Sequence, residues 1–257
     1  MPDVRFQLSD LILNSNYEGK RDNQMAGLRD LNGIFWNTQK RVRVEFNGET
    51  IASATNAMLH RESSYQLHYY FLEDEVNWDF LEKSDKVEES DSKGRQQFYH
   101  IRVGDKVAEN AAWAFPDEPP NEKRPDLRDY VAFNWRAMDA WYEEDEQVYV
   151  HPRDPFHRID IIQGSRHVRI EANGVTIAET DRPTLLFETG LPVRYYIPLD
   201  DINTEHMEPT DLRTGCPYKG FASYWTIAAD GVMHDNVAWV YQDPFYESRK
   251  IKGLVSL

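Results

Sequence analysis

The sequence predicts a mainly β protein with one or few α-helices, built as two tandem domains related by internal duplication. The segment VRVEFNGETIA, which begins at Val42, recurs as VRIEANGVTIA, which begins at Val168, at an offset of 126 residues (168 − 42 = 126). That offset holds without a gap as far as Asp117 and Asp243, and a register of this length is the signature of a structural repeat. Within each copy, short stretches alternate between apolar and polar residues and are bounded by turn residues, which is typical of antiparallel strands.

Each repeat is predicted to open with a β-hairpin. The dipeptides Asn47-Gly48 and Asn173-Gly174 have the residue types that adopt the positive φ of a two-residue turn, and alternating stretches flank both. Residues 126–141 follow a proline-rich stretch, carry apolar residues at helical spacing and predict an α-helix. Further strands are expected at residues 66–71, 98–103, 106–108, 193–197 and 222–228.

The predicted domain boundaries follow from the repeat. Residues 1–40 form an N-terminal extension, and residues 41–147 form the first repeat with its C-terminal helix. Residues 148–166 are a connector that carries proline and charge, and residues 167–257 form the second repeat.

Charge and composition favour some partners over others. A net charge of −15 repels phosphate backbones and anionic lipids, so neither nucleic acid nor membrane is expected as a partner. With 7 Trp and 14 Tyr, the chain has the composition of a packed β protein with aromatic-lined pockets, which favours a small-molecule ligand or substrate. Cys216 is the single cysteine, so no intramolecular disulfide forms, and the N-terminal residues do not resemble a signal peptide. We therefore expect a cytoplasmic protein, and the sequence leaves homodimer formation open.

Three motifs of the second copy carry a family resemblance. The segments ETGLPVRYY at 188–196, EPTDLRTGCPYKGFASYW at 208–225 and NVAW at 236–239 are similar to the domain-of-unknown-function family DUF427. The segment VHPRDPFHRIDII between the copies resembles the connector of tandem members of that family, so the resemblance covers nearly everything from about Val42 onward. It implies a β-tent-like fold with two antiparallel sheets in each copy, as in cereblon-like domains. Such relatives often hold zinc on paired cysteines, which this chain lacks.

The first copy departs from the family pattern at its most specific segment. Where the second copy reads GCPYKG at residues 215–220, the first reads ESDSKG at residues 89–94, and ETGLPVRYY is replaced by ESSYQLHYY. The first copy therefore has no equivalent of Cys216, Tyr218 or Arg194. We expect any chemistry to reside in the second copy.

The second copy supplies residue types for acid–base chemistry and for anion binding. Lys219 can form an imine or bind an anion, and the thiol of Cys216 can act as a nucleophile. A histidine side chain can exchange protons near neutral pH, and His206 stands where the first copy has Phe80, so the fold does not require an imidazole there. The guanidinium of Arg194 can clamp a carboxylate or phosphate. The candidate catalytic residues are Lys219, His206, Glu188, Asp211 and Cys216, and the candidate substrate-binding residues are Arg194, Tyr195, Tyr196, Tyr218, Trp225 and Trp239.

These candidates also have structural alternatives. An unpaired cysteine is commonly a small buried apolar residue, and a single histidine in a β-rich segment often only packs. Arg194 can pair with Glu188 simply to support the fold. Glu188 and Tyr195 recur in the first copy as Glu62 and Tyr69, as structural residues would.

No metal or cofactor is expected. His151, Asp154 and His157 have residue types that bind metals, but Pro152 and Pro155 prevent the helix that would align them.

Two functions remain open. The first is a metal-independent enzyme of small-molecule metabolism, of the isomerase, cyclase or lyase type, with its site in the second repeat. The alternative is a non-catalytic module that binds a small ligand or a peptide.

Overall fold

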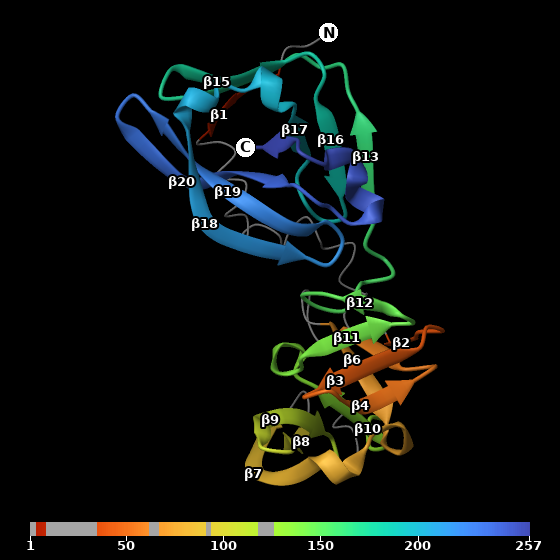
Figure 1. Cartoon of the computed structure of the whole chain (residues 1–257). Coiled ribbons are helices and arrows are strands. Elements are labelled where there is room, and N and C mark those ends of the chain that lie inside the picture. The colour runs from red at the N-terminus through yellow and green to blue at the C-terminus, as the bar shows by residue number, and fades with distance from the viewer. Residues whose placement is uncertain (1–3, 9–34, 62–66, 91–93, 118–125) are drawn as a thin grey trace. The chain divides into compact units, whose positions relative to one another are not determined.

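The computed structural model describes residues 4–8, 35–61, 67–90, 94–117 and 126–257. They divide into two compact units (Figure 1). One unit contains residues 35–154 and corresponds to the first repeat. The other combines residues 4–8 with Pro155–Leu257 and contains the second repeat.

The first-repeat unit consists of a seven-stranded sheet and a four-stranded sheet. The larger sheet has the order β2-β5-β6-β10-β9-β8-β7, with strands at Phe35–Asn37, Met58–Arg61, Leu67–Leu72, Tyr130–Phe133, Lys106–Ala114, Gly94–Val103 and Leu81–Ser90. The smaller has the order β12-β11-β3-β4, with strands at Glu146–Val148, Ala140–Glu143, Val42–Phe46 and Glu49–Ala54. Short 3-10 helices are η3 at Glu73–Glu75, η4 at Trp78–Phe80 and η5 at Trp135–Ala137.

The second-repeat unit has the same plan. Its seven-stranded sheet has the order β13-β16-β17-β21-β20-β19-β18, with strands at Ile159–Gln163, Thr184–Glu188, Arg194–Ile197, Val255–Ser256, Val232–Tyr241, Gly220–Ala229 and Met207–Cys216. Its smaller sheet has the order β1-β14-β15, with strands at Val4–Gln7, Val168–Ala172 and Val175–Thr180. The 3-10 helices are η6 at Leu199–Asp201, η7 at Thr204–His206 and η8 at Tyr246–Ile251. The predicted mainly β fold with two sheets in each of two tandem domains is thus confirmed.

The hairpins at the start of each repeat form as predicted and are built alike. Asn47 and Asn173 both have φ of 48°. The side-chain amide of Asn47 donates to the carbonyl of Val103 at 3.0 Å, and that of Asn173 donates to the carbonyl of Ala229 at 3.1 Å. Each turn is therefore tied to the same distant strand of its own unit, at the offset that the sequence gives.

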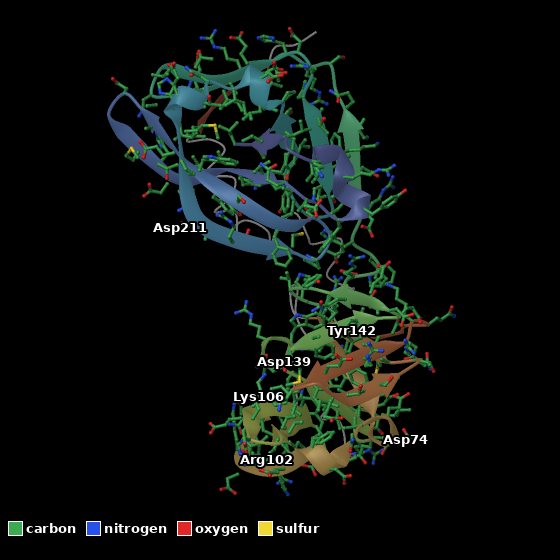
Figure 2. All side chains as sticks on the ribbon, viewed as in Figure 1. Asp74, Arg102, Lys106, Asp139, Tyr142 and Asp211 are labelled. Atoms are coloured by element: carbon green, nitrogen blue, oxygen red, sulfur yellow. The ribbon has the colours of Figure 1, made fainter. Side chains whose placement is uncertain are left out.

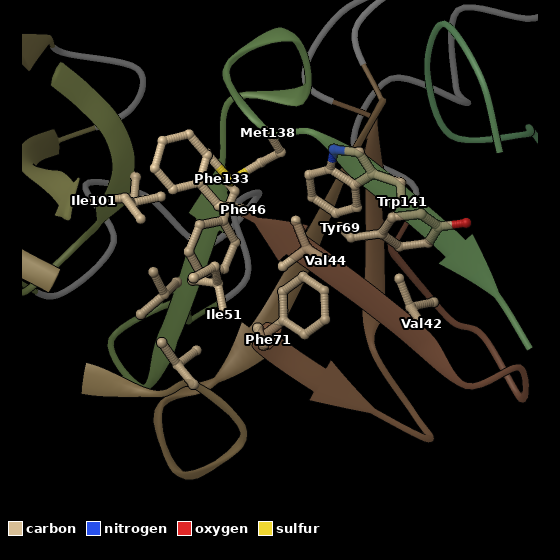
Figure 3. Packing of buried hydrophobic residues seen from close by; sticks show 14 of the residues in the cluster. Val42, Val44, Phe46, Ile51, Tyr69, Phe71, Ile101, Phe133, Met138 and Trp141 are labelled. Atoms are coloured by element: carbon tan, nitrogen blue, oxygen red, sulfur yellow. The ribbon is translucent and has the colours of Figure 1, made fainter. Parts of the chain in front are cut away.

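The core of the first-repeat unit lies between its two sheets (Figure 3). Along β3, Val42, Val44 and Phe46 are buried, while the residues between them are only partly buried. This alternation places the apolar side chains of one strand face against Phe71 and Trp141. The period-two pattern in the sequence therefore decides which face of the sheet is buried.

Two apolar clusters of the second-repeat unit lie on opposite faces of its large sheet. On β17, Ile197 belongs to the cluster that includes Val168 and Ile170 of the small sheet. Tyr196, its neighbour in sequence, belongs to another cluster, with Leu186. Successive residues of a strand point to opposite faces, so the second cluster lies on the face away from the small sheet.

The helix predicted at residues 126–141 is wrong. This stretch forms β10, η5 and β11 instead. Strand β10 lies between β6 and β9, and its last three residues are all buried, so it shows a continuous apolar run rather than alternation. Asn134 then starts η5 by accepting a hydrogen bond from the backbone amide of Arg136. The apolar residues of these three elements happen to fall at the spacing that is typical of a helix.

Residues 4–8 belong structurally to the second repeat. Strand β1 runs parallel to β14 and pairs with Val168 through Glu171. At the matching edge of the first repeat, β11 runs antiparallel to β3 and pairs with Val42 through Glu45. The second repeat therefore completes its small sheet with a strand from the start of the chain. This parallel pair differs from the expected all-antiparallel sheets.

Strand β13 also differs from the expected boundaries. The predicted connector extends to residue 166, yet Ile159–Gln163 is the edge strand of the large sheet and pairs with β16. In the described part of the chain, no helix is long and apolar enough to cross a bilayer.

The hairpin turns give a first testable prediction. Asn173→Ala should lower the free energy of unfolding by about 2 kcal/mol, because alanine tolerates positive φ poorly and the bond to Ala229 is lost. Asn173→Gly keeps the backbone conformation accessible, so it should lower the free energy of unfolding by less than Asn173→Ala does. Urea unfolding of both variants measures the difference, and equal costs would contradict the role of the positive φ.

Candidate functional site

Glu188 is the centre of a polar cluster on the large sheet of the second repeat. It is the last residue of β16, and its side chain is only 6% exposed. The register pairs it with Ile159, which places it on the sheet face that carries Tyr196. Nζ of Lys219 donates to one carboxylate oxygen at 2.5 Å, and Nε2 of His157 lies 2.9 Å from the other. One buried carboxylate thus holds an ammonium and an imidazole.

The turn between β18 and β19 positions Lys219. The backbone amide of Phe245 donates to the carbonyl of Lys219 at 3.2 Å, and the buried hydroxyl of Ser248 donates to the carbonyl of Tyr218 at 3.0 Å. Gly220 has φ of +101°, a conformation that other residues rarely adopt. These contacts hold the turn in the conformation in which the ammonium of Lys219 reaches Glu188.

His157 also belongs to this cluster, although the sequence did not identify it as a site residue. Its ring stacks on Tyr218, with centroids 4.4 Å apart and an interplanar angle of 21°. His157 precedes Ile159 by two residues, and Ile159 lies opposite Glu188. Because residues two apart in an extended segment share a face, a correct prediction of β13 would have placed this imidazole beside Glu188.

The carboxyl group of Glu188 is held in its ionised form. Burial raises its pKa, but hydrogen bonds from His157 and Lys219 and the ammonium charge outweigh burial and lower the pKa overall. Glu188 is therefore suited to orienting its two partners rather than to accepting a proton near neutral pH.

Arg194 lies on the same face but is not the ion-pair partner of Glu188. Its guanidinium lies over the ring of Trp239, 5.5 Å from the centroid. Burial lowers its pKa, and the neighbouring Tyr196 and Glu188 offset part of that effect. Within the described part of the chain, Arg194 has no ion pair, because Glu188 pairs with Lys219 instead.

Trp239 and Tyr196 form a scaffold that both repeats share. The indole NH of Trp239 donates to the hydroxyl of Tyr196 at 3.4 Å, and Trp113 donates to Tyr70 at the same distance in the first repeat. In the first repeat, His68 packs edge-on against Trp113 at 5.1 Å, where the second has Arg194. The aromatic pair is common to both copies, whereas the cation above it is specific to the second.

Three tyrosines and Cys216 complete this face. Burial raises the pKa of Tyr241 well above its usual range, and Tyr196, Cys216 and Tyr224 add to the rise, so these groups face one another. Burial also raises the pKa of Tyr196. The thiol of Cys216 is half-buried beside them. Seven of the eleven candidates thus lie together on this face: Glu188, Arg194, Tyr196, Cys216, Tyr218, Lys219 and Trp239.

Tyr195 and Trp225 lie on the opposite face. Both pack against the cluster that faces the small sheet. The hydroxyl of Tyr195 accepts a hydrogen bond from Arg166 at 3.2 Å. Each follows a residue of the site face, Arg194 or Tyr224, so alternation along a strand turns it away.

His206 and Asp211 are also apart from the cluster. Nδ1 of His206 lies 2.8 Å from the carbonyl of Ala228, and His206 directly precedes β18. Cys216 ends that ten-residue strand, which at about 3.3 Å per residue spans roughly 30 Å. Asp211 is exposed on β18 (Figure 2), where the register shifts between Pro209 and Arg213.

The metal-compatible residues of the connector have separate partners. Nδ1 of His151 lies 2.8 Å from the carbonyl of Pro152, Asp154 pairs with Arg61, and His157 contacts Glu188. Among the described residues, no group of three or more His, Cys, Asp and Glu is arranged to hold a metal ion.

Comparison with known proteins identifies a family. No curated protein matches the chain in sequence. The family model for the domain of unknown function DUF427 matches residues 35–144 and again residues 160–257, which agrees with the two structural repeats, and the chain therefore belongs to the DUF427 family.

Proposed function

We propose that the second repeat is the active centre of a metal-independent enzyme that moves protons on a small organic molecule, of the isomerase, cyclase or lyase type. The observation that carries the proposal is the buried carboxylate of Glu188, which contacts both His157 and Lys219. An oriented imidazole next to an ammonium on an aromatic face is a recurring arrangement for acid–base catalysis.

The proposed roles follow from the contacts. When the Nε2 hydrogen of His157 is donated to Glu188, Nδ1 is the nitrogen that can accept a proton from the substrate. Glu188 acts as a positioning residue, because it fixes the imidazole and stabilises the imidazolium that forms. Lys219 supplies positive charge where negative charge develops on the substrate.

The proposal extends to the setting of the reaction. The single cysteine and the net charge of −15 support a cytoplasmic enzyme whose partner is a small molecule rather than nucleic acid or membrane.

Proton exchange tests the proposal directly. The chain is incubated in D2O with a panel of small organic acids that carry a C–H bond next to a carbonyl group, and proton NMR records exchange and conversion. We expect turnover of at least one class, lowered about 10²–10⁴-fold by His157→Gln, because the general base is lost. His167→Gln removes a histidine of the same unit that pairs with Asp181, and it should leave the rate unchanged. Turnover that survives His157→Gln would refute the assignment of the base.

A second candidate function is a non-catalytic module that binds a small ligand or a peptide. The observation that favours it is that Glu188 already neutralises Lys219, so the buried pair can serve structure alone. In that case members of the panel bind saturably to the second repeat, and none is exchanged or converted.

A further inference from the structure

The charges of the second-repeat site do not cancel. Glu188 and Lys219 neutralise each other across 2.5 Å. Arg194 has no ion pair in the described part of the chain, and its guanidinium lies over the ring of Trp239. With His157 neutral, as a base must be, the site keeps one net positive charge, located at Arg194.

Burial makes this unmatched charge unfavourable without a ligand. The lowered pKa of Arg194 reflects removal of its guanidinium from water. The ring of Trp239 offsets only part of that loss, because an aromatic face attracts a cation more weakly than a carboxylate does. An anion beside the guanidinium would supply a charge-assisted, bidentate contact.

The surroundings of Arg194 are suited to an organic body rather than to a bare ion. The rings of Tyr224 and Trp239 lie 6.4 Å apart, and the hydroxyls of Tyr224 and Thr214 are within 2.7 Å of each other. Where the second copy has Tyr224 and Tyr241, the first has Phe98 and Phe115, so the second copy carries two hydroxyl groups that the first lacks.

We infer that Arg194 receives the carboxylate of a monoanionic organic acid whose planar body lies along Trp239 and Tyr224. One unmatched positive charge fits one negative charge, which favours a carboxylate over a phosphate monoester with about two negative charges at neutral pH. The inference deepens the proposed function, since it names the substrate class of the same site.

Three probes with a common ring test this inference: benzoate, benzamide and phenyl phosphate. Calorimetry or ligand-observed NMR on the full chain should show that benzoate binds at least about tenfold more tightly than benzamide, because a hydrogen bond to a charged group is lost. Phenyl phosphate should bind more weakly than benzoate. Equal binding of benzoate and benzamide, absence of benzoate binding, or tighter binding of phenyl phosphate would each overturn the inference.

Arg194→His places at this position the residue type of the first repeat, where His68 packs edge-on against Trp113. A histidine with a pKa of about 6.5 carries charge at pH 5.5 but little at pH 7.5. The variant should therefore bind benzoate at the lower pH and lose binding at the higher pH, whereas the native chain binds at both. Arg182→His, at an exposed arginine paired with Asp201, is the matched control and should bind as the native chain does. Native-like binding by Arg194→His at pH 7.5 would overturn the inference.

The same probes separate this inference from the proposed function. His157→Gln should abolish turnover and leave benzoate binding unchanged. Benzoate binding that requires Arg194, in a chain that converts no substrate, would support the anion site and refute the enzyme. Turnover that depends on His157 but not on Arg194 would support the enzyme and refute the anion site.

Discussion

Glu188→Gln should destabilise the second-repeat unit by about 3–5 kcal/mol, because it leaves a buried ammonium without its counter-charge. The side chain of Lys219 is only 12% exposed, and Glu188 is its ion-pair partner at 2.5 Å. The amide oxygen of glutamine can still accept a hydrogen bond from His157, so the expected loss comes mainly from Lys219. Urea unfolding, followed by hydrogen exchange of the β16 and β19 amides, measures the effect and assigns it to this unit.

Two controls distinguish the cost of an unpaired buried charge from the cost of any other substitution in an ion pair. The double variant Glu188→Gln with Lys219→Met removes both charges and should recover most of the lost stability. Asp201→Asn breaks a pair whose arginine, Arg182, is 59% exposed, and it should cost less than about 1 kcal/mol. A double variant as unstable as Glu188→Gln alone would contradict the account.

The cost of Glu188→Gln should also depend on pH in a defined direction. The folded-state pKa of Glu188 lies below the ordinary value of 4.5. Its ion pair therefore stabilises the fold fully above that ordinary value, and the stabilisation is lost as pH falls through the depressed folded-state pKa. The difference in the free energy of unfolding between the native chain and the Glu188→Gln variant should be largest near neutral pH and should shrink in strong acid.

The sequence predicts correctly the strands that bury one face. It predicts incorrectly the strand β10, which buries both faces. Strands β3 and β14 alternate strictly and end at Asn-Gly, so period and turn chemistry agree. Strand β10 has neighbours on both sides and apolar residues on both faces, so its pattern does not distinguish a strand from a helix. Parallel pairing of β1 with β14 has no local signal, because it joins segments far apart in the chain.

The comparison of the two copies identified much of the site. The alternation of side chains along a strand explains why some other candidates lie elsewhere. Arg194 and Tyr218 differ from their counterparts in the first copy, and both lie on the face that carries Glu188. Tyr195 is a candidate that lies away from this face, because the alternation of β17 directs it to the other side of the sheet. His157 lies outside the repeated register, so no comparison of copies could reveal it.

Leu8→Ala should destabilise the second-repeat unit by about 2–5 kcal/mol and leave the first-repeat unit unchanged. Leu8 is 1% exposed and packs in one cluster with Val168, Ile170 and Ile197, although more than 150 residues of chain separate it from all of them. Loss of its side chain opens a cavity that this sheet cannot easily close. The effect should therefore be confined to the unit that β1 completes.

Hydrogen exchange can assign that loss to one unit. Protection of the β14 and β15 amides should fall, while that of β3 and β4 stays as in the native chain. Leu199→Ala, at a leucine of the same unit that is 50% exposed, should change stability by less than about 0.5 kcal/mol. Equal loss of protection in both units would contradict the division of the core. Loss in the second unit alone would mean that the first repeat is inserted, along the chain, between two segments of the unit that carries the site.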